Sequence, residues 1–266
     1  MLTAYITWNV DPEIFRIGNL AVRYYGLLFA LGFYLGYLIM ARIFRIEKVP
    51  QARLDQLALL MIAATIIGAR LGHCLFYEPE YYLSRPLEMF MVWKGGLASH
   101  GAAIGILLAL WWFTKKSGKS FLWILDRIVI TVALAGSFIR LGNLMNSEIY
   151  GEPTSLPWGF LFLRNFEELP RHPTQIYESL AYLLIFVFLY LTYEKKRTSL
   201  KEGFNFGWFL VLLFTTRFLV EFIKNPQVGF EEGMALNMGQ LLSIPFILMG
   251  AWILFRYAYA PRDSKG

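Results

Sequence analysis

The chain alternates long apolar stretches with short polar loops along its whole length. Each apolar stretch has roughly 18 to 25 residues, enough for a helix to cross a hydrocarbon core of about 30 Å. Seven such stretches occur, at about 22–44, 55–77, 97–114, 121–140, 175–193, 205–222 and 237–257. Lipid cannot satisfy unpaired backbone groups, and no segment shows the ten-residue alternation of an outer-membrane barrel, so the pattern predicts helices. We therefore expect an all-α integral membrane protein, a polytopic bundle of seven transmembrane helices in a single transmembrane domain, 1–266.

The composition agrees with a membrane protein. Hydrophobic residues make up 57% of the chain and charged residues only 17%, whereas about a quarter of the residues in soluble domains are charged. Cys74 is the single cysteine, which excludes an internal disulfide, and no paired Cys/His spacing suggests a metal site. We expect neither a metal nor a cofactor. The first twenty residues lack a basic region followed by a cleavage site, so we expect no removable signal peptide.

The basic residues are sorted by loop and form no patch with interleaved aromatic residues, so a nucleic-acid partner is not expected. Fourteen lie after the first, third, fifth and last predicted helices: Arg42, Arg45, Lys48, Arg53, Lys115, Lys116, Lys119, Lys195, Lys196, Arg197, Lys201, Arg256, Arg262 and Lys265. Six lie on the other side: Arg16, Arg85, Lys94, Arg164, Arg171 and Lys224. Because basic loops stay in the cytoplasm, the sorting predicts an N-terminus outside and a C-terminus inside.

Two segments on the predicted outer side are longer than the inner loops, at about 78–96 and 141–174. Both are rich in aromatic residues, which favour the depth of the lipid headgroups, so we expect interfacial segments there. Small residues one turn apart, in "GFYLG" (Gly32, Gly36) and "GAAIG" (Gly101, Gly105), predict close approach of neighbouring helices.

Polar side chains within the predicted helices gather at their outer ends. They are Arg23, Tyr24, Tyr25, Arg70, His73, His100, Arg140, Asn143, His172, Gln175, Glu178, Arg217 and Glu221. Ionisable groups at membrane depth cost at least about 2.5 to 3.5 kcal/mol each, so they usually face the bundle interior and mark a site. Arg217 and Glu221 are four residues apart and can pair, and His172, Gln175 and Glu178 step by three along one helix face. Asp126–Arg127 lies nearer the inner end, as an interfacial pair that supports packing.

Several arginines at headgroup depth suit a phosphate, because a guanidinium presents a planar fork of donors to two oxygens. A nearby histidine offers an acid or base that titrates near neutral pH. No Ser–His–Asp elbow, P-loop or metal-binding histidine pair is present. The residue types therefore indicate group transfer from a lipid phosphate, without a covalent enzyme intermediate or a bound metal.

Simpler interpretations exist for single residues. Arg23 or Arg70 can extend to the headgroups, and Tyr24 and Tyr25 fit an aromatic belt. For the whole chain the main alternative is a transporter or flippase for an anionic lipid, but the hydrophobic segments are not interrupted in matched halves and the polar groups favour one leaflet over the midplane. A scaffold that binds lipoproteins is a further alternative, and it would not need several arginines at one depth.

The segment "RLGNLMNSEIYG" (140–151) resembles the signature R-x-G-N-x-x-N-x-E-x-x-G of bacterial prolipoprotein diacylglyceryl transferases. The matching positions are Arg140, Gly142, Asn143, Asn146, Glu148 and Gly151. The resemblance continues, in the family's order and over most of the chain, in "VRYYG", "SHGAAIG", "RHPTQIYE" and "RFLVEF". One departure is Ala102, which stands where the family commonly has a second glycine.

This resemblance implies an enzyme with seven transmembrane helices in the bacterial cytoplasmic membrane, with its active site facing the outer leaflet. Such an enzyme transfers the diacylglyceryl group of phosphatidylglycerol to the lipobox cysteine in the signal peptide of a prolipoprotein. Glycerol-1-phosphate leaves and a thioether forms, as the first step of lipoprotein maturation. The attacking sulfur belongs to the substrate, so the enzyme needs no nucleophilic cysteine of its own.

The resemblance also implies roles for residues of this chain. Catalysis is expected from Tyr25, His100, Arg140 and Arg217. The two arginines would hold the phosphate, and His100 or Tyr25 would help to form the thiolate, an alternative that the sequence leaves open. Binding of the substrate is expected at Arg140, Asn143, Asn146, Glu148, Gly151, His172, Gln175 and Glu221. Within this set Gly151 would shape a turn and Glu221 would orient Arg217.

Overall fold

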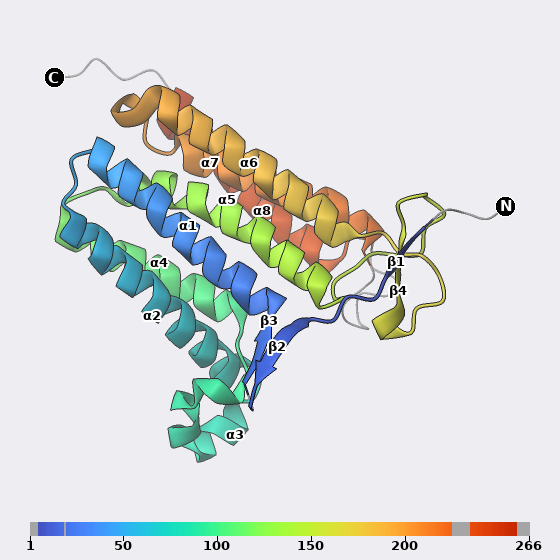
Figure 1. Cartoon of the computed structure of the whole chain (residues 1–266). Helices are drawn as coiled ribbons and strands as arrows, with labels where there is room; N and C mark the ends of the chain where they lie inside the picture. Colours follow the sequence, from blue (N-terminus) through green and yellow to red (C-terminus); the bar gives the residue numbers. More distant parts are fainter. Residues whose placement is uncertain (1–4, 19, 225–234, 260–266) are drawn as a thin grey trace. The chain divides into compact units, whose positions relative to one another are not determined.

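The computed structural model describes residues 5–18, 20–224 and 235–259. Contacts divide the chain into two compact units, which we describe separately. The first unit comprises Met1–Ile39 together with Asp126–Gly266, and the second comprises Met40–Leu125. Figure 1 labels the elements along the chain.

The described ranges contain eight α-helices (Figure 1). They are α1 (Tyr24–Ile46), α2 (Gln51–Phe76), α3 (Pro79–Ser84), α4 (Ser99–Ser117), α5 (Phe121–Met145), α6 (Thr174–Lys196), α7 (Phe204–Val220) and α8 (Met238–Ile253). Within these ranges six helices are long and apolar enough to cross a membrane, namely α1, α2, α5, α6, α7 and α8, some with a short continuation. Helix α4 occupies the expected span at 97–114, but it has Ser99 and His100 at one end and Lys115 and Lys116 at the other. The apolar centre of α4 is therefore shorter than that of the six other long helices.

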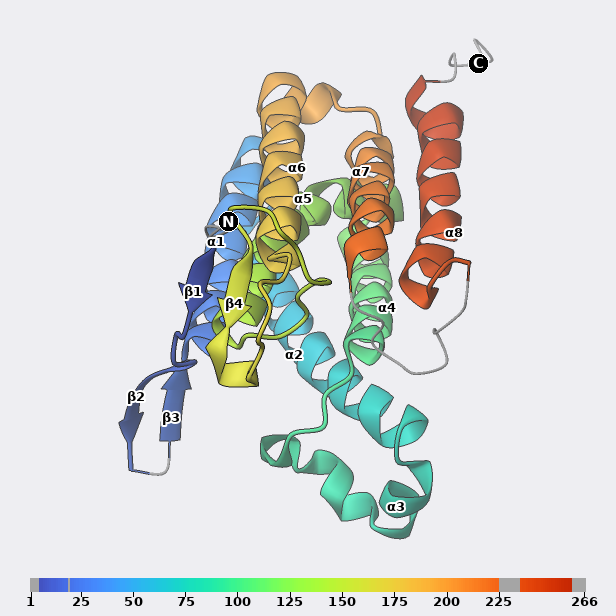
Figure 2. The ribbon, with the colours of Figure 1, turned by 90° about the vertical axis from the view of Figure 1, so that its right-hand side faces the viewer.

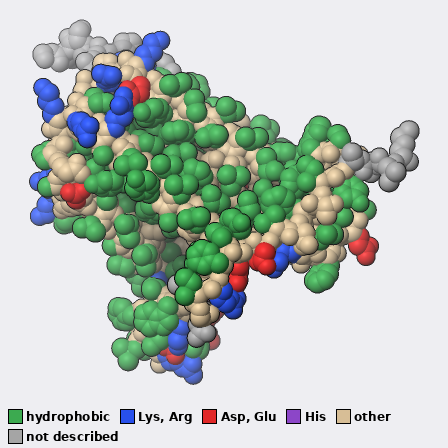
Figure 3. Space-filling model, in the orientation of Figure 1, with side chains coloured by type: hydrophobic (Ala, Val, Ile, Leu, Met, Phe, Trp, Pro, Cys, Tyr) green, Lys and Arg blue, Asp and Glu red, His purple; other side chains and the backbone are tan. Residues whose placement is uncertain are grey.

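The outward faces of the long helices carry large apolar side chains, as the hydrophobic surface in Figure 3 illustrates. Leu59 of α2 and Leu184 of α6 are each 70% exposed, and Leu248 of α8 is 64% exposed. Apolar patches of this extent are rare on proteins surrounded by water, whereas lipid tails accept them at no cost. The chain is a multi-pass helical membrane protein.

Within the described residues, four short strands depart from the all-helical expectation. In the first unit β1 (Ile6–Trp8) pairs in parallel with β4 (Phe160–Phe162), and β2 (Glu13–Ile17) pairs antiparallel with β3 (Leu20–Arg23). Their three to five residues are too few to produce a recognisable alternation. Arg23 consequently ends a strand and does not lie within a helix, because α1 begins at Tyr24.

Most helix boundaries fall within a few residues of those expected. Helix α5 ends at Met145, five residues beyond the stretch expected at about 121–140. Helix α8 is continued by a π-helical segment, Leu254–Tyr259, which reaches the expected end of the last span. In the first unit α7 and α8 lie side by side (Figure 2), and Phe214 stacks on Phe246 with ring centroids 4.3 Å apart.

Glycines provide the close helix contacts that the sequence predicts. In the first unit a Cβ at Gly32 would lie 3.2 Å from Cβ of Ala135, on α5. In the second unit a Cβ at Gly101 would lie only 2.6 Å from Cα of Gly72, so α4 crosses α2 with the backbones in contact. The crossing continues at Gly105, where a Cβ would lie 3.2 Å from Cα of Gly68. The crossing therefore runs through Gly101 and Gly105, on a different side of α4 from Ala102.

Asp126 acts as a helix cap and not only as a packing partner of Arg127. Its carboxylate, 0% exposed, accepts backbone N–H groups from Gly203 at 2.7 Å and from Phe206 at 2.8 Å. These groups lie at the first turn of α7, where N–H donors have no partner within the helix. The guanidinium of Arg127 is 3.9 Å from the same carboxylate. The pair thus fixes α7 against α5.

Candidate functional site

The loop that follows α5 is a tight turn that fixes one carboxylate. Ser147 and Ile149 adopt positive φ angles of 54° and 60°, which only a few per cent of non-glycine residues do. Glu148 is thereby turned back, and its Oε1 accepts hydrogen bonds from Nδ2 of Asn143 at 2.7 Å and from Nδ2 of Asn146 at 3.2 Å. The two asparagines of the motif orient the glutamate of the motif.

The first turn of α6 holds this loop through its carbonyl groups. Gln175 Nε2 donates to the carbonyl of Glu148 at 2.7 Å, and Thr174 Oγ1 donates to that of Ile149 at 2.8 Å. Both side chains are fully buried. Gln175 therefore supports the loop from the protein side.

Gly151 closes the loop where there is no room for a side chain. Its N–H donates to the carbonyl of His172 at 2.9 Å, and a Cβ at this position would overlap the carbonyl oxygen of Ile223. The prediction that Gly151 shapes the turn is consistent with this packing, although its backbone does not have a positive φ. What the position requires is close approach.

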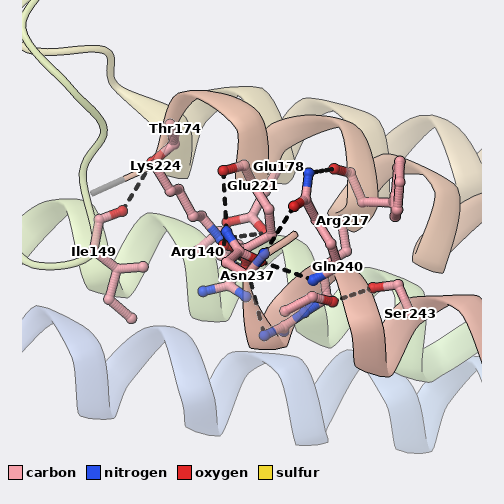
Figure 4. Close-up of polar contacts among 12 residues, drawn as sticks. Arg140, Ile149, Thr174, Glu178, Arg217, Glu221, Lys224, Asn237, Gln240 and Ser243 are labelled. Carbon is pink, nitrogen blue, oxygen red and sulfur yellow. Dashed lines mark hydrogen bonds and ion pairs between the residues drawn. The ribbon is translucent and has the colours of Figure 1, made fainter. Parts of the chain in front are cut away.

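Five charged side chains from α5, α6 and the end of α7 form one network, shown in Figure 4. Arg140 Nε lies 3.1 Å from Glu178 Oε2, and Lys224 Nζ lies 3.1 Å from Glu178 Oε1. The same lysine is 3.3 Å from Glu221 Oε1, which is in turn 3.7 Å from Arg217 Nη2. The i, i+4 pair of Arg217 and Glu221 was predicted. The two arginines are thus joined through two glutamates and a lysine.

Burial differs along this network. Glu178 is 0% exposed and Lys224 is 4% exposed, whereas the side chain of Arg217 is 36% exposed. Arg140, 14% exposed, also donates from Nη1 to Asn143 Oδ1 at 3.3 Å. Three cations face two anions, so the formal net charge of the network is +1. An anion is the expected ligand at its two guanidinium groups.

Lys224 is the member of the network that sequence reasoning missed. The sequence places it only among the basic residues of a predicted outer loop. A signal was present, because Lys224 lies three residues after Glu221 and seven after Arg217 and so continues the spacing of one helix face. Its backbone also bridges to Gly151, which ties the end of α7 to the loop.

Tyr25 and Gly142 form the contact between α1 and the motif. A Cβ at Gly142 would lie 2.7 Å from Cδ2 of the Tyr25 ring. The glycine of the motif therefore has a definite packing reason, since it leaves room for the tyrosine ring against α5, two residues from Arg140. The structure brings Tyr25 beside the motif, as the candidate role for this residue requires.

His172 does not share a helix face with Gln175 and Glu178, so the prediction of a step of three is wrong for this residue. Helix α6 begins at Thr174, and Pro173 precedes it. His172 Nδ1 lies 3.3 Å from the hydroxyl of Tyr177, which also accepts from Trp158 Nε1 at 2.9 Å. The backbone of His172 pairs with Gly151, so its visible role is in the loop.

A polar cavity of about 430 Å³ lies beside the motif in the first unit. Its lining comes from the N-terminal strands, the motif and the segment after β4: Asp11, Pro12, Glu13, Arg16, Arg23, Asn146, Glu148 and Arg164. The hydrogen bonds from Arg16 hold the pKa of the Glu13 carboxyl below its ordinary value. Arg164 lies 3.5 Å from Asp11. Glu148 is thus reachable from a charged, open cavity, while Asn143 holds it from the interior.

The remaining candidates belong to the second unit. Arg70 is buried and donates to the carbonyl groups of Glu88 at 2.6 Å and Met89 at 3.1 Å. It therefore anchors the predicted interfacial segment at 78–96. His73 stacks on Tyr77 with ring centroids 5.7 Å apart, and His100, in the first turn of α4, is exposed and lies 5.6 Å from the same ring. Among the described residues no group of three metal-ligating side chains occurs.

A comparison with known proteins covers the residues of this site. The family model described as "Prolipoprotein diacylglyceryl transferase" matches residues 12–256 of this chain. That range contains every residue of the network and of the loop after α5.

Curated relatives extend the match to nearly the full length. A phosphatidylglycerol–prolipoprotein diacylglyceryl transferase of Tolumonas auensis is 49% identical over 91% of this chain and 94% of its own length. The protein of the same name from Chloroherpeton thalassium is 46% identical over 96% and 95%, respectively. That of Porphyromonas gingivalis is 44% identical over 99% of both chains.

Proposed function

Because the chain belongs to the prolipoprotein diacylglyceryl transferase family, we propose that it attaches diacylglyceryl groups to prolipoproteins as their first maturation step. It is a transferase. The donor is phosphatidylglycerol and the acceptor is the thiol of the lipobox cysteine in the signal peptide. The observation that carries the proposal is the network in which two arginines of the family's motifs, Arg140 and Arg217, are joined through buried glutamates.

In the proposed reaction the acceptor sulfur, as a thiolate, attacks the carbon of the diacylglyceryl group that is bonded to the phosphate oxygen. A C–S bond forms, the C–O bond breaks, and glycerol-1-phosphate leaves with the bonding electron pair. The thiol proton passes to a base on the enzyme or to the leaving phosphate, so atoms and charges balance. No metal or cofactor is required by this scheme.

We assign the phosphate to Arg140 and Arg217, whose guanidinium forks stabilise the charge that develops on the leaving oxygen. Asn143, Asn146 and Glu148 would orient the headgroup glycerol, and Glu221 would orient Arg217. Glu148 is suited to the glycerol hydroxyls because it is held rigidly by two amides and borders the polar cavity. Gly151, Gln175 and His172 would contribute by fixing the loop.

His100 or Tyr25 is proposed to assist thiolate formation. His100 has an exposed imidazole, and imidazole is the side chain most often used for general base catalysis. Tyr25 lies beside the motif, where its hydroxyl can act near Arg140. The two proposals make different predictions for single variants.

We further propose seven transmembrane helices, with α4 as the third, in one transmembrane domain in the bacterial cytoplasmic membrane. The N-terminus would be outside and the C-terminus inside, because the loops after the first, third and fifth helices hold the basic residues. In this orientation Arg140 and Arg217 face the outer leaflet, where a secreted prolipoprotein presents its cysteine.

The test is to incubate the purified protein with phosphatidylglycerol and a lipobox peptide and to measure the peptide's mass. A gain of one diacylglyceryl group is expected, and a Cys→Ser peptide should remain unmodified. Modification of that control peptide would refute thioether formation.

Two variants separate the roles within this assay. Arg140→Ala should lose nearly all activity, by about 10² or more, because a preorganised charge on the reacting phosphate is removed. His100→Ala should lose about 10²-fold if His100 is the base. A wild-type rate for the histidine variant would assign the proton transfer elsewhere, with Tyr25→Phe as the next test.

A further inference from the structure

Lys224 occupies the centre of the charged network yet lies in no part of the motifs considered so far. Its ammonium group is 3.1 Å from Glu178 Oε1 and 3.3 Å from Glu221 Oε1 (Figure 4). The side chain is 2% exposed. A buried lysine that contacts two carboxylates at once is held in place by charge and leaves little room for direct contact with a lipid.

The two glutamates that Lys224 contacts are the partners of the two arginines. Glu178 uses its other oxygen, Oε2, for Arg140. Glu221 Oε1 is shared between Lys224 and the more distant Arg217, at 3.3 Å and 3.7 Å, respectively. Without the lysine, two arginines would face two glutamates, and the cluster would be neutral.

From this arrangement we infer that Lys224 is a positioning residue that offsets the charge of Glu178 and Glu221, so that Arg140 and Arg217 keep net positive charge for an anionic lipid phosphate. The inference rests on the proposed function, because it names the phosphate as the ligand. The glutamates fix the two guanidinium groups in place. The lysine offsets the negative charge of the glutamates, so the charge of the guanidinium groups is not cancelled.

The backbone of Lys224 supports the same role. It bridges to Gly151, and the carbonyl of the preceding Ile223 accepts the N–H of Glu152 at 2.9 Å. Asn237, at the start of α8, donates from Nδ2 to Glu221 Oε2 at 3.3 Å. The backbone of the lysine is therefore tied to the loop after α5, and the Glu221 carboxylate is held by Asn237 as well.

The experiment measures the dissociation constant for phosphatidylglycerol in detergent micelles, without acceptor peptide, on the full-length purified protein. Lys224→Met should raise this constant at least about tenfold, which corresponds to about 1.4 kcal/mol. Lys224→Arg keeps the charge, so its dissociation constant should stay within about threefold of the wild-type value, well below a tenfold change. Lys201→Met removes an exposed lysine of the same unit and should leave binding unchanged.

A double variant separates charge from packing. Lys224→Met with Glu221→Gln leaves two arginines and one glutamate, so the net charge of the cluster returns to that of the wild type. Binding of phosphatidylglycerol should be tighter than in Lys224→Met, because the net charge is restored. It should stay weaker than in the wild type, because Glu221 also orients Arg217. This variant carries no unpaired glutamate, so it also serves if Lys224→Met does not fold.

Unchanged binding in Lys224→Met with only a lower melting temperature would overturn the inference, and so would a double variant that binds no better than the single one. Failure of the proposed function looks different. In that case the wild type binds phosphatidylglycerol but adds no mass to the lipobox peptide.

Discussion

At the level of single residues, the site depends on conformations that residue types alone do not reveal. The sequence predicts the pair of Arg217 and Glu221, because a spacing of four residues brings two side chains together on any helix. It does not predict that Asn143 and Asn146 hold Glu148, since that contact requires positive φ angles at Ser147 and Ile149. Such angles are uncommon for residues other than glycine, asparagine or aspartate.

Gly142 is a second case in which the structure supplies the reason. The ring of Tyr25 occupies the space where a Cβ would lie, 2.7 Å from Cδ2. Gly142→Ala should lower the free energy of unfolding by about 1 to 3 kcal/mol, as expected for overpacking. Thermal unfolding of the purified variant in detergent measures this loss.

The control for this prediction is a double-mutant cycle with Tyr25→Ala. In the background that lacks the ring, Gly142→Ala should cost little or gain stability from the better helix propensity of alanine. An equal loss in both backgrounds would show that the ring is not what requires the glycine.

At the level of elements, apolar length predicted the positions of the helices within a few residues, and small residues predicted where they touch. The four strands were not predicted, and neither were the hydrogen bonds by which Arg70 anchors the segment at 78–96. Strands of three to five residues carry too little alternation, and the hydrogen bonds of Arg70 go to backbone carbonyl groups, which every sequence possesses. Helix α5 continues to Met145, beyond the apolar stretch at 121–140, because a helix can include polar residues such as Asn143.

The crossing of α2 and α4 gives a testable prediction for an element. Gly101→Ala would place a methyl group 2.6 Å from Cα of Gly72, with backbone on both sides and no side chain able to yield. The melting temperature in detergent should fall, with a loss of about 1 to 3 kcal/mol.

Ala103→Leu is the matched control, since it enlarges an exposed residue two positions along the same helix. Its melting temperature should stay close to that of the wild type. If Gly101→Ala were as stable as this control, the helices would not be in backbone contact.

For the whole molecule, the sequence carries information about the membrane that the contacts between residues do not. Exposed leucines identify the lipid-facing surfaces, but only the sorting of fourteen basic residues against six predicts which ends face the cytoplasm. The proposed reaction depends on this orientation, because the acceptor cysteine and the network must meet on the same side of the membrane.

Orientation can be measured with two isosteric substitutions in a Cys74→Ala background, which removes the single native cysteine, itself buried. Ser155→Cys lies between α5 and α6, and Ser199→Cys lies between α6 and α7, and both serines are exposed. A membrane-impermeant maleimide added to intact cells should label position 155 and leave position 199 unlabelled until the cells are permeabilised. Because both sites are open to solvent, protection of one must come from the membrane and not from folding. Labelling of position 199 in intact cells would invert the orientation and place Arg140 and Arg217 away from any secreted acceptor.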